Sequence, residues 1–312
     1  MGVLSIVIPC YNEELTIPLF YREILQIVDR LQTELELIFV DDGSSDRTLA
    51  VIKELAAADH RIKYMSFSRN FGKEAAVYAG LKWASGKFTA VMDADLQDPP
   101  SMLPDMLRAV REEGYDSAAA RRADRRGEPP IRSFFAHGFY RIFAHMSTVE
   151  LMDGARDYRV MTRQFTDAVL NLGEYNRFSK GLFGWVGFQT KWFDYKNTDR
   201  VAGTSKWSFW KLFLYSVEGI VSFSTAPLTA ALALGIIFGM VSLGGFLVCG
   251  YRAMAFHSSM WPAAFWGILL VSGLQLFCIG IVGIYLAKSY MEIKGRPIFL
   301  CRESNMKETG ND

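Results

Sequence analysis

Two long uncharged apolar runs near the C-terminal end constrain the fold of this chain more than any other feature. They cover residues 226–250 and 262–287, and neither contains a charged side chain. At about 1.5 Å per helical residue, each run can cross the roughly 30 Å hydrocarbon core of a bilayer. Burial in a large soluble core is the alternative, but uncharged runs of this length are rare there. The sequence therefore predicts two membrane-spanning helices.

The basic residues around these runs predict their orientation. Lys206 and Lys211 precede the first run, and Lys288 and Lys294 follow the second, whereas residues 251–261 between the runs contain a single arginine. By the positive-inside rule, both chain ends face the cytoplasm and the connection faces outward. The N-terminal MGVLSIVIPC lacks the features of a signal peptide, which agrees with a cytoplasmic first domain.

The composition limits the remaining classes of function. A length of 312 residues is enough for about two structural units. The net charge is +1 and no basic stripe interleaved with aromatic residues occurs, so we expect no nucleic-acid partner. The four cysteines are far apart and have no Cys-x-x-Cys spacing, which predicts reduced thiols without a disulfide framework or zinc site.

The first two-thirds of the chain alternate between short β-rich runs and helical patterns. The predicted strands are VLSIVIP, LELIFVDD, IKYMSFS and KFTAVMDAD, and the predicted helices cover roughly residues 14–31, 45–58, 73–84 and 101–112. This order predicts right-handed crossovers and an α/β fold with a mostly parallel sheet between two layers of helices.

Polar residues follow each predicted strand. They are Tyr11 to Glu13, Asp41 to Ser44, Arg69 to Lys73, and Asp93 to Asp95. One such loop is an ordinary turn. Four of them at the carboxyl edge of a parallel sheet, where ligands of such folds bind, predict a binding site.

Several motifs carry a resemblance to a known family. PCYNEE, VDDGSSDRT and DADLQDPP, in this order, resemble the inverting family 2 glycosyltransferases, which have the Rossmann-like GT-A fold. Further segments resemble the polyprenyl-phosphate glycosyltransferases, most closely the bactoprenol (undecaprenyl-phosphate) glucosyltransferases of O-antigen modification. These segments are SRNFGKEAAVYAGL, RDYRVMTR, RVAGTSKW, VEGIVSFSTAPL and KGRPI. The resemblance covers nearly the whole chain, although residues 121–130 match only loosely.

The DAD stretch has the chemistry of a metal site. Asp93 and Asp95 are two residues apart, so on a strand their side chains share a face. Their carboxylates are hard oxygen donors that suit Mg²⁺ or Mn²⁺ together with the diphosphate of a nucleotide sugar. The resemblance implies that Gln97 also lines the metal site and that Asp95 serves catalysis.

The resemblance further implies the residues that act on the acceptor. It places the catalytic base at Asp157 and assigns Arg159 to a donor or acceptor phosphate. Asp153, beside Gly154, is the alternative base, although Asp-Gly also suits a turn. Asp157 has its own alternative, a simple ion pair with a neighbouring arginine.

The resemblance implies a donor site formed by Pro9, Tyr11, Glu13, Asp41, Asp42, Lys73, Asp93, Arg200 and Lys206. Lys73 lies at a predicted helix start, where its charge and the free backbone N–H groups attract phosphate. A solvated helix position is the alternative for Lys73. Arg200 and Lys206 belong to a segment that resembles the lid over the donor diphosphate.

The acceptor accounts for the membrane segments. Residues 205–222 mix aromatic side chains with lysines and predict a helix in the headgroup layer, and residues 132–146 predict a second interfacial helix. Arg122, Arg126 and Arg132 suit a lipid phosphate, with a solvated charged loop as the alternative.

These features predict a four-part chain. It has a cytoplasmic GT-A domain at 1–204, an interfacial helix at 205–222, a two-helix transmembrane domain at 223–289 and a cytoplasmic tail at 290–312. We expect a homo-oligomer in the bacterial inner membrane, with the catalytic domain and both termini cytoplasmic.

The expected activity is metal-dependent, inverting transfer of a hexose, most simply glucose from UDP-glucose, to undecaprenyl phosphate. The same reaction with GDP-mannose, UDP-GlcNAc or a modified pentose donor is the alternative. A non-catalytic membrane scaffold and a sugar-lipid transporter are alternatives from other classes, and uncharged spans disfavour the transporter.

Overall fold

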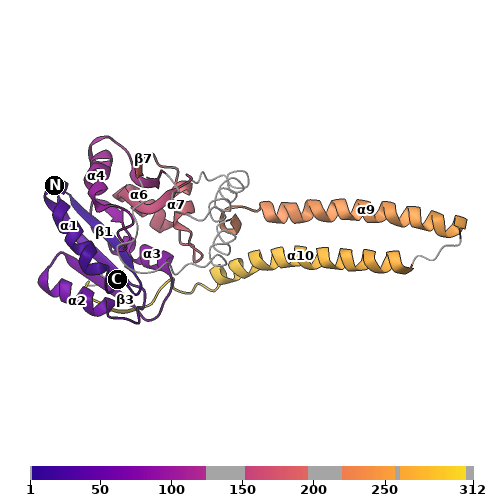
Figure 1. Ribbon diagram of the computed structural model, residues 1–312, viewed down its shortest axis with the longest axis horizontal. Helices are drawn as coiled ribbons and strands as arrows, with labels where there is room; N and C mark the ends of the chain where they lie inside the picture. Colours follow the sequence, from indigo (N-terminus) through magenta and orange to yellow (C-terminus); the bar gives the residue numbers. More distant parts are fainter. Residues whose placement is uncertain (1, 124–151, 196–219, 257–260, 307–312) are drawn as a thin grey trace.

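The computed structural model describes residues 2–123, 152–195, 220–256 and 261–306. An α/β domain continues into two long helices, α9 (Ala226–Phe256) and α10 (Trp261–Ile293), which lie side by side (Figure 1). The predicted interfacial helix at 132–146, most of the one at 205–222, and the domain boundary at residue 204 fall outside the described residues.

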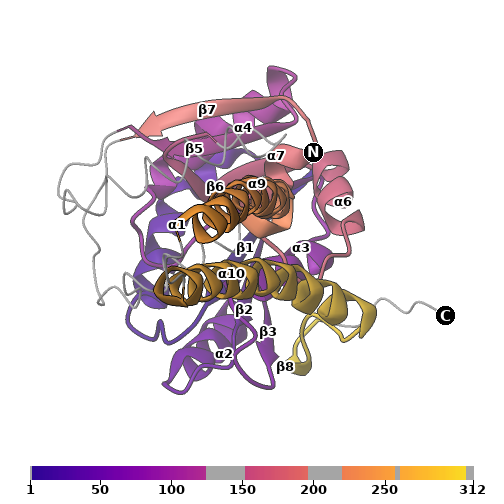
Figure 2. The same ribbon diagram turned by 90° about the vertical axis from the view of Figure 1, so that its right-hand side faces the viewer.

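The described residues form an eight-stranded sheet with the strand order β7-β5-β6-β4-β1-β2-β3-β8 (Figure 2). The four central strands are parallel, and β6 and β8 run antiparallel to their inner neighbours. The strands are β1 (Val3–Cys10), β2 (Glu34–Asp41), β3 (Ile62–Phe67), β4 (Phe88–Val91), β5 (Ser117–Arg122), β6 (Ala155–Thr162), β7 (Thr190–Tyr195) and β8 (Cys301–Ser304).

Helices cover both faces of this sheet. One face packs against α1 (Ile17–Leu31), α2 (Thr48–Ala58) and α4 (Leu103–Glu112), which begins after a short 3-10 turn at Pro100–Met102. The other face packs against α3 (Lys73–Trp83), α6 (Arg163–Asn171) and α7 (Ser179–Trp185). The predicted α/β class and mostly parallel sheet are confirmed. The prediction succeeds because apolar runs bounded by polar turns mark the buried strands.

A glycine brings α3 close to the sheet. A Cβ at Gly80 would lie 2.1 Å from Cγ1 of Val7, on β1. Such a contact is far inside van der Waals distance, so only glycine permits this separation between helix and strand. The approach matters for function because α3 carries Lys73 at its first residue.

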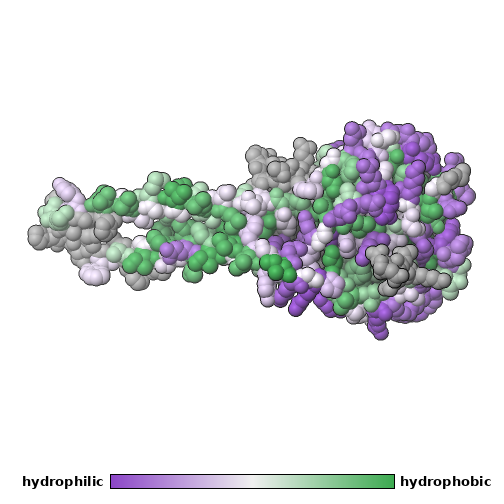
Figure 3. All heavy atoms as spheres, turned by 180° about the vertical axis from the view of Figure 1, so that it is seen from behind, coloured by the Kyte–Doolittle hydropathy of each residue, from purple (hydrophilic) through white to green (hydrophobic). Residues whose placement is uncertain are grey.

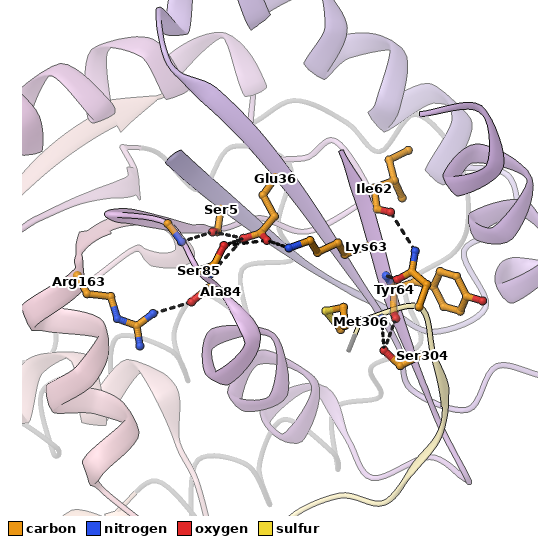
Figure 4. A network of polar contacts seen from close by, with 12 residues as sticks. Ser5, Glu36, Ile62, Lys63, Tyr64, Ala84, Ser85, Arg163, Ser304 and Met306 are labelled. Atoms are coloured by element: carbon orange, nitrogen blue, oxygen red, sulfur yellow. Dashed lines mark hydrogen bonds and ion pairs between the residues drawn. The ribbon is translucent and has the colours of Figure 1, made fainter. Parts of the chain in front are cut away.

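A buried polar network fixes the amino end of the strands (Figure 4). Glu36 on β2 is 4% exposed, and its carboxylate accepts hydrogen bonds from Lys63 and Ser5 and from the N–H of Ser85 at 3.1 Å. Burial opposes ionisation, but these donors hold the pKa of Glu36 below its usual value. The network joins β1, β2, β3 and the loop before β4.

The chain returns to the sheet after the two long helices. Strand β8 pairs antiparallel with β3, Phe299 stacks on Phe67 with ring centroids 4.9 Å apart, and Lys53 pairs with Glu303 at 2.5 Å. The segment 290–312, predicted as a tail, therefore contains the end of α10 and an edge strand. The helix pair is an insertion before the last strand of the sheet.

The two long helices expose their apolar surface. Two stretches, Ala226–Gly245 and Leu270–Ile293, are long and apolar enough to cross a membrane, and almost none of either is buried inside the protein. Hydrophobic residues predominate on the coloured parts of the two helices, whereas hydrophilic residues are widespread on the α/β domain (Figure 3). The exposure of apolar side chains on α9 and α10 disfavours the alternative of two helices buried in a soluble core.

Gly80→Ala should lower the stability of the α/β domain, because the added methyl group collides with Val7. We expect a loss of about 1–3 kcal/mol, measured by thermal melting in detergent. Gly173→Ala is the control, because a Cβ there has open space. Adding Val7→Ala should restore part of the loss, and an unchanged melting temperature for Gly80→Ala would contradict the close packing.

Candidate active site

The carboxyl ends of the parallel strands meet at one edge of the sheet. The register pairs Cys10 with Asp41, and Asp41 with Ser66, so β1, β2 and β3 end at the same level. Strand β4 runs parallel to β1 and ends at Val91. The polar loops that the sequence predicts at this edge are thus together.

Lys73 joins two carboxylates at this edge. Strand β6 runs antiparallel to β4 with Arg159 opposite Val91, which brings Asp157 level with Asp93. The Lys73 Nζ lies 2.7 Å from Oδ1 of Asp93 and 2.6 Å from Oδ2 of Asp157. Both carboxylate side chains are 22% exposed and the lysine side chain is 40% exposed, so the cluster is open to a ligand.

The ionic partner of Asp157 is therefore Lys73, rather than a neighbouring arginine. Burial alone would raise the pKa of the Asp157 carboxyl, but the charges of Lys73 and Lys180 hold that pKa well below its usual range. Asp157 is thus ionised at neutral pH. The sequence offers no signal for the Lys73 and Lys180 contributions, because only the fold brings these residues to Asp157.

Asp93 and Asp95 are not on a strand, and the expectation that strand alternation aligns them is wrong. Strand β4 ends at Val91, and both residues lie in the turn that follows. Within this turn, Oδ1 of Asp95 accepts the N–H of Gln97 at 3.1 Å, and Leu96 adopts a left-handed φ of 57°. The turn itself, rather than strand pleating, positions the two carboxylates.

An ion pair between the buried Asp98 and the partly exposed Arg156 supports this turn. Asp98 is 3% exposed and accepts hydrogen bonds from the hydroxyl of Tyr195 and from Nε of Arg156, the latter at 3.0 Å. Arg156 also donates to Oε1 of Gln97 at 3.4 Å. These roles of Asp98 and Arg156 were not predicted from the sequence, although the acidic residue that closes DADLQD is a signal for such a support.

Asp41 and Asp42 are buried and hold neighbouring loops. Asp41 accepts the N–H of Ser44 at 3.1 Å and the hydroxyl of Ser66 at 2.7 Å. Asp42 accepts the N–H of Phe71 at 2.6 Å and that of Gly72 at 3.0 Å. Burial raises the pKa of Asp42 to about 6. Their contact with a nucleotide base stays a prediction, and the structure gives both a role in loop geometry.

The loop that follows β1 lies beside the loop that follows β2. The Asn12 side chain accepts the N–H of Ser45 at 2.8 Å, and the Glu13 carboxylate accepts the hydroxyl of Thr16 at 2.7 Å. Tyr11 is 38% exposed, and Pro9 is half-buried near the end of β1. The predicted donor residues of this loop are therefore at the rim.

The structure places Arg159 in the interior rather than at the rim. It is 4% exposed, donates to Oγ of Ser117 at 3.0 Å, and lies 4.8 Å from the ring centroid of Phe183. Burial lowers the pKa of Arg159 to about 10. These are the contacts of a core residue. Its predicted role at a phosphate has no support in this placement.

The remaining predicted residues divide into two groups. Asp153 is exposed in the turn before β6, where Gly154 has a φ of 79°, so it fits the turn interpretation. Arg122 is half-buried at the end of β5, and its N–H donates to the carbonyl of Gly154 at 2.9 Å. The others lie outside the described residues, namely Arg126, Arg132, Arg200 and Lys206.

The residues of the turn fit a divalent metal that binds together with phosphate. No group of three or more His, Cys, Asp or Glu side chains in a metal-ligating arrangement occurs within the described ranges. Mg²⁺ is commonly held by only one or two carboxylates plus substrate phosphates. Asp93 already binds a cation, the Lys73 ammonium, at 2.7 Å, which shows that its carboxylate suits a positive charge.

Contacts connect this cluster to the long helices. Glu74, next to Lys73, accepts hydrogen bonds from the N–H of Ser179, at 2.9 Å, and from its hydroxyl. The neighbouring Phe178 packs against Phe223, three residues before α9, with ring centroids 6.0 Å apart. The carboxylate of Glu292, near the end of α10, accepts the N–H groups of residues 175 and 176 at 3.0 and 3.2 Å.

The fold and the site define a class: an α/β protein with a polar site at the carboxyl edge of a parallel sheet and an apolar helix pair beside it. Residues 5–170 match the model for glycosyl transferase family 2, and the chain belongs to this family. It is therefore a glycosyltransferase. The family and the sheet together confirm the predicted GT-A class.

Curated relatives match over nearly the whole chain. The chain is 40% identical to the putative glycosyltransferase CsbB of Bacillus subtilis (strain 168), across 98% of this chain and 93% of that protein. It is 36% identical to the SfII prophage-derived bactoprenol glucosyl transferase of Shigella flexneri, across 97% of this chain and 98% of that protein. The resemblance drawn from the motifs is confirmed.

Solved structures with a similar arrangement are more distant. The mannosyl-3-phosphoglycerate synthase of Rubrobacter xylanophilus has a TM-score of 0.48 and 19% identity, over 70% of this chain and 71% of that chain. The glucosyl-3-phosphoglycerate synthase of Mycobacterium tuberculosis, in complex with Mn²⁺ and UDP-glucose, has a TM-score of 0.45 and 21% identity, over 70% and 77%.

Asp42→Asn should change how stability depends on pH. Burial raises the pKa of Asp42 in the folded protein from 3.8 to about 6. Below pH 3.8 the carboxyl is protonated in both states and costs no stability, but the free energy of unfolding falls as the pH rises from 3.8 toward about 6. The asparagine variant lacks this penalty, which is on the order of 2 to 3 kcal/mol. Its melting temperature relative to wild type should therefore be higher at about pH 7.5 than at about pH 5.

The comparison between the two pH values separates this effect from the pH-independent loss of backbone hydrogen bonds at Asp42. Asp105→Asn, on the exposed side of α4, is the matched control and should show no such difference. A constant offset for Asp42→Asn at both pH values would contradict the raised pKa.

Proposed function

We propose that this glycosyltransferase moves a hexose, most simply glucose from UDP-glucose, onto undecaprenyl or another polyprenyl phosphate at the cytoplasmic membrane face, with inversion at the anomeric carbon. The observation that carries the proposal is the Asp93–Lys73–Asp157 cluster, linked by Glu74 and Ser179 to the segment that enters α9. A site so connected suits a water-soluble donor and a lipid acceptor.

The name of the Shigella flexneri relative, a bactoprenol glucosyl transferase, supports glucose as the transferred sugar and a polyprenyl lipid as its acceptor. The apolar exposed helices support a membrane location, since an acceptor confined to the bilayer requires the enzyme to remain at its surface. The distribution of basic residues around α9 and α10 supports a cytoplasmic location for both chain ends. The homo-oligomer stays a prediction.

The donor lies along the rim in this proposal. Tyr11 and Glu13 flank the base and ribose, with Pro9 beneath them, and the loops held by Asp41 and Asp42 complete that side. Lys73 faces the diphosphate, because it is a partly exposed cation at a helix start. Arg200 and Lys206 lie outside the described residues, and their role at the diphosphate stays a prediction.

The metal proposal concerns the turn after β4. Asp93, Asp95 and Gln97 would hold Mg²⁺ or Mn²⁺ together with donor phosphate oxygens. When bound, the ion neutralises negative charge on the departing nucleoside diphosphate. The ion pair between Asp98 and Arg156 keeps the turn in place.

The chemical step asks little of a base. A phosphate monoester has a second pKa of about 6, so the acceptor is mostly a dianion at neutral pH. One of its oxygens attacks the anomeric carbon while the bond from that carbon to the donor diphosphate breaks on the opposite face. The bond pair leaves with the nucleoside diphosphate, and a dianionic acceptor requires no proton transfer.

Asp157 then orients the Lys73 ammonium and does not deprotonate the acceptor. Lys73 holds the pKa of Asp157 low, which makes this carboxylate a weak proton acceptor. Its charge fixes the Lys73 ammonium beside the reacting phosphates. This role differs from the general base that the family resemblance implies, and the two can be separated experimentally.

Asp95→Ala should abolish transfer while the protein stays folded and inserted in the membrane. We expect the rate to fall about a hundredfold or more, because charge on the leaving diphosphate is no longer neutralised. The measurement is transfer of radiolabel from UDP-glucose into a butanol-extractable lipid by purified protein with undecaprenyl phosphate.

A panel with GDP-mannose and UDP-GlcNAc tests the donor in the same assay. Excess chelator should silence the wild type, and Asp105→Asn should remain active. Full activity in EDTA would remove the metal role. Failure of every donor to label lipid would refute the enzyme proposal in favour of a scaffold or transporter.

Asp157→Asn should lower kcat about tenfold to a hundredfold while nucleotide binding stays nearly unchanged. If Asp157 orients Lys73, raising the pH should not restore the rate. Recovery of activity at higher pH would instead support proton transfer. Turnover close to wild type would eliminate Asp157 and return attention to Asp153.

A further inference from the structure

We infer that Lys73 is an exchangeable internal cation, which holds Asp93 until metal and nucleotide arrive together and then moves to the donor diphosphate. The inference rests on the proposed function, and it adds an order of events that neither the motifs nor the relatives contain. It begins from one juxtaposition: a lysine ammonium bound to a carboxylate of the DAD turn.

The contact of Lys73 with Asp93 is direct and competes with a metal. Its Nζ lies 2.7 Å from Oδ1 and 2.8 Å from Oδ2 of Asp93, so it covers both oxygens of the carboxylate. A divalent ion on Asp93 requires the same oxygens. The ion would also lie within a few ångströms of the ammonium, and the two positive charges repel each other.

The backbone at Lys73 is clamped on both sides. Before it, the Asp42 carboxylate accepts the N–H groups of Phe71 and Gly72. After it, Glu74 accepts the hydroxyl and N–H of Ser179. Movement therefore belongs to the long side chain, which is 40% exposed and has rotatable bonds.

The donor diphosphate removes the conflict. Its oxygens would accept both a metal and the ammonium, so their negative charge would offset the repulsion between the two cations. Asp157 stays within reach of the ammonium and keeps it at the rim. Without nucleotide, a metal has to displace the Lys73 ammonium from the Asp93 carboxylate. With nucleotide, the ammonium can move to the diphosphate and leave Asp93 available to the metal.

The exchange makes metal and nucleotide binding mutually dependent. Without ligands, the ammonium balances charge between Asp93 and Asp157, so the acidic turn does not collect free divalent ions. With nucleotide, the same ammonium becomes a contact that favours binding. The sign of the effect of Lys73 on metal affinity should therefore reverse when nucleotide is present.

Lys73→Met tests this reversal. Binding of Mn²⁺ to the full-length protein in detergent is followed by the electron paramagnetic resonance signal of free Mn²⁺, with and without saturating UDP or GDP. Without nucleotide, we expect the variant to bind Mn²⁺ about tenfold more tightly than wild type. With nucleotide, we expect binding about threefold weaker or more, because the ammonium–diphosphate contact is lost.

Lys82→Met, exposed in the last turn of the same helix, is the matched control and should leave both affinities unchanged. Lys73→Gln, which keeps a polar end without the charge, serves if the methionine variant does not fold by thermal melting. Unchanged affinity without nucleotide would overturn the inference, because Lys73 then does not compete for Asp93.

Equal tightening with and without nucleotide would also overturn it, because Lys73 then stays beside Asp93 as a fixed like charge. These outcomes require no sugar transfer. If neither nucleotide binds, the proposed function fails, while the nucleotide-free measurement still decides whether Lys73 competes with the metal.

Discussion

The ion bridge from Lys73 to Asp93 and Asp157 is the interaction on which the site depends. Strands β4 and β6 run antiparallel, so Asp157 on β6 lies level with Asp93 in the turn after β4, and two like charges there need a cation between them. Helix α3 supplies it, because Gly80 lets the helix lie close to β1 and the Asp42 carboxylate fixes the residues before the helix. Core packing and site chemistry thus meet in a single helix.

The two ends of the sheet use charge differently. At the amino end, Glu36 is buried and accepts hydrogen bonds from Lys63, Ser5 and Ser85, so its charge stabilises the strand ends and is closed to ligands. At the carboxyl end, the Lys73 cluster is partly exposed. A satisfied buried network holds the frame rigid, which leaves the open cluster free to change partners without loss of the fold.

Sequence patterns locate elements well and long-range contacts poorly. Apolar runs with polar borders place the central strands and α3, and Lys73 begins that helix as expected. The end of β4 is different, because β4 stops at Val91 although both of its neighbours, β1 and β6, extend further, and the apolar pattern does not mark that point. The 84-residue separation of Lys73 and Asp157 leaves no local trace. Arg159 resembles a site residue in sequence, but the aromatic rings around it come from distant segments.

The position of β8 has a consequence for biogenesis. Ribosomes synthesise the chain from the N-terminus to the C-terminus, so β3 is made long before Cys301 to Ser304 can pair with it. Until α9 and α10 have emerged, the backbone edge of β3 is uncovered and able to pair with other chains. Completion of the sheet therefore follows synthesis of both long helices, and any delay before Cys301 to Ser304 are made prolongs the exposure of the β3 edge.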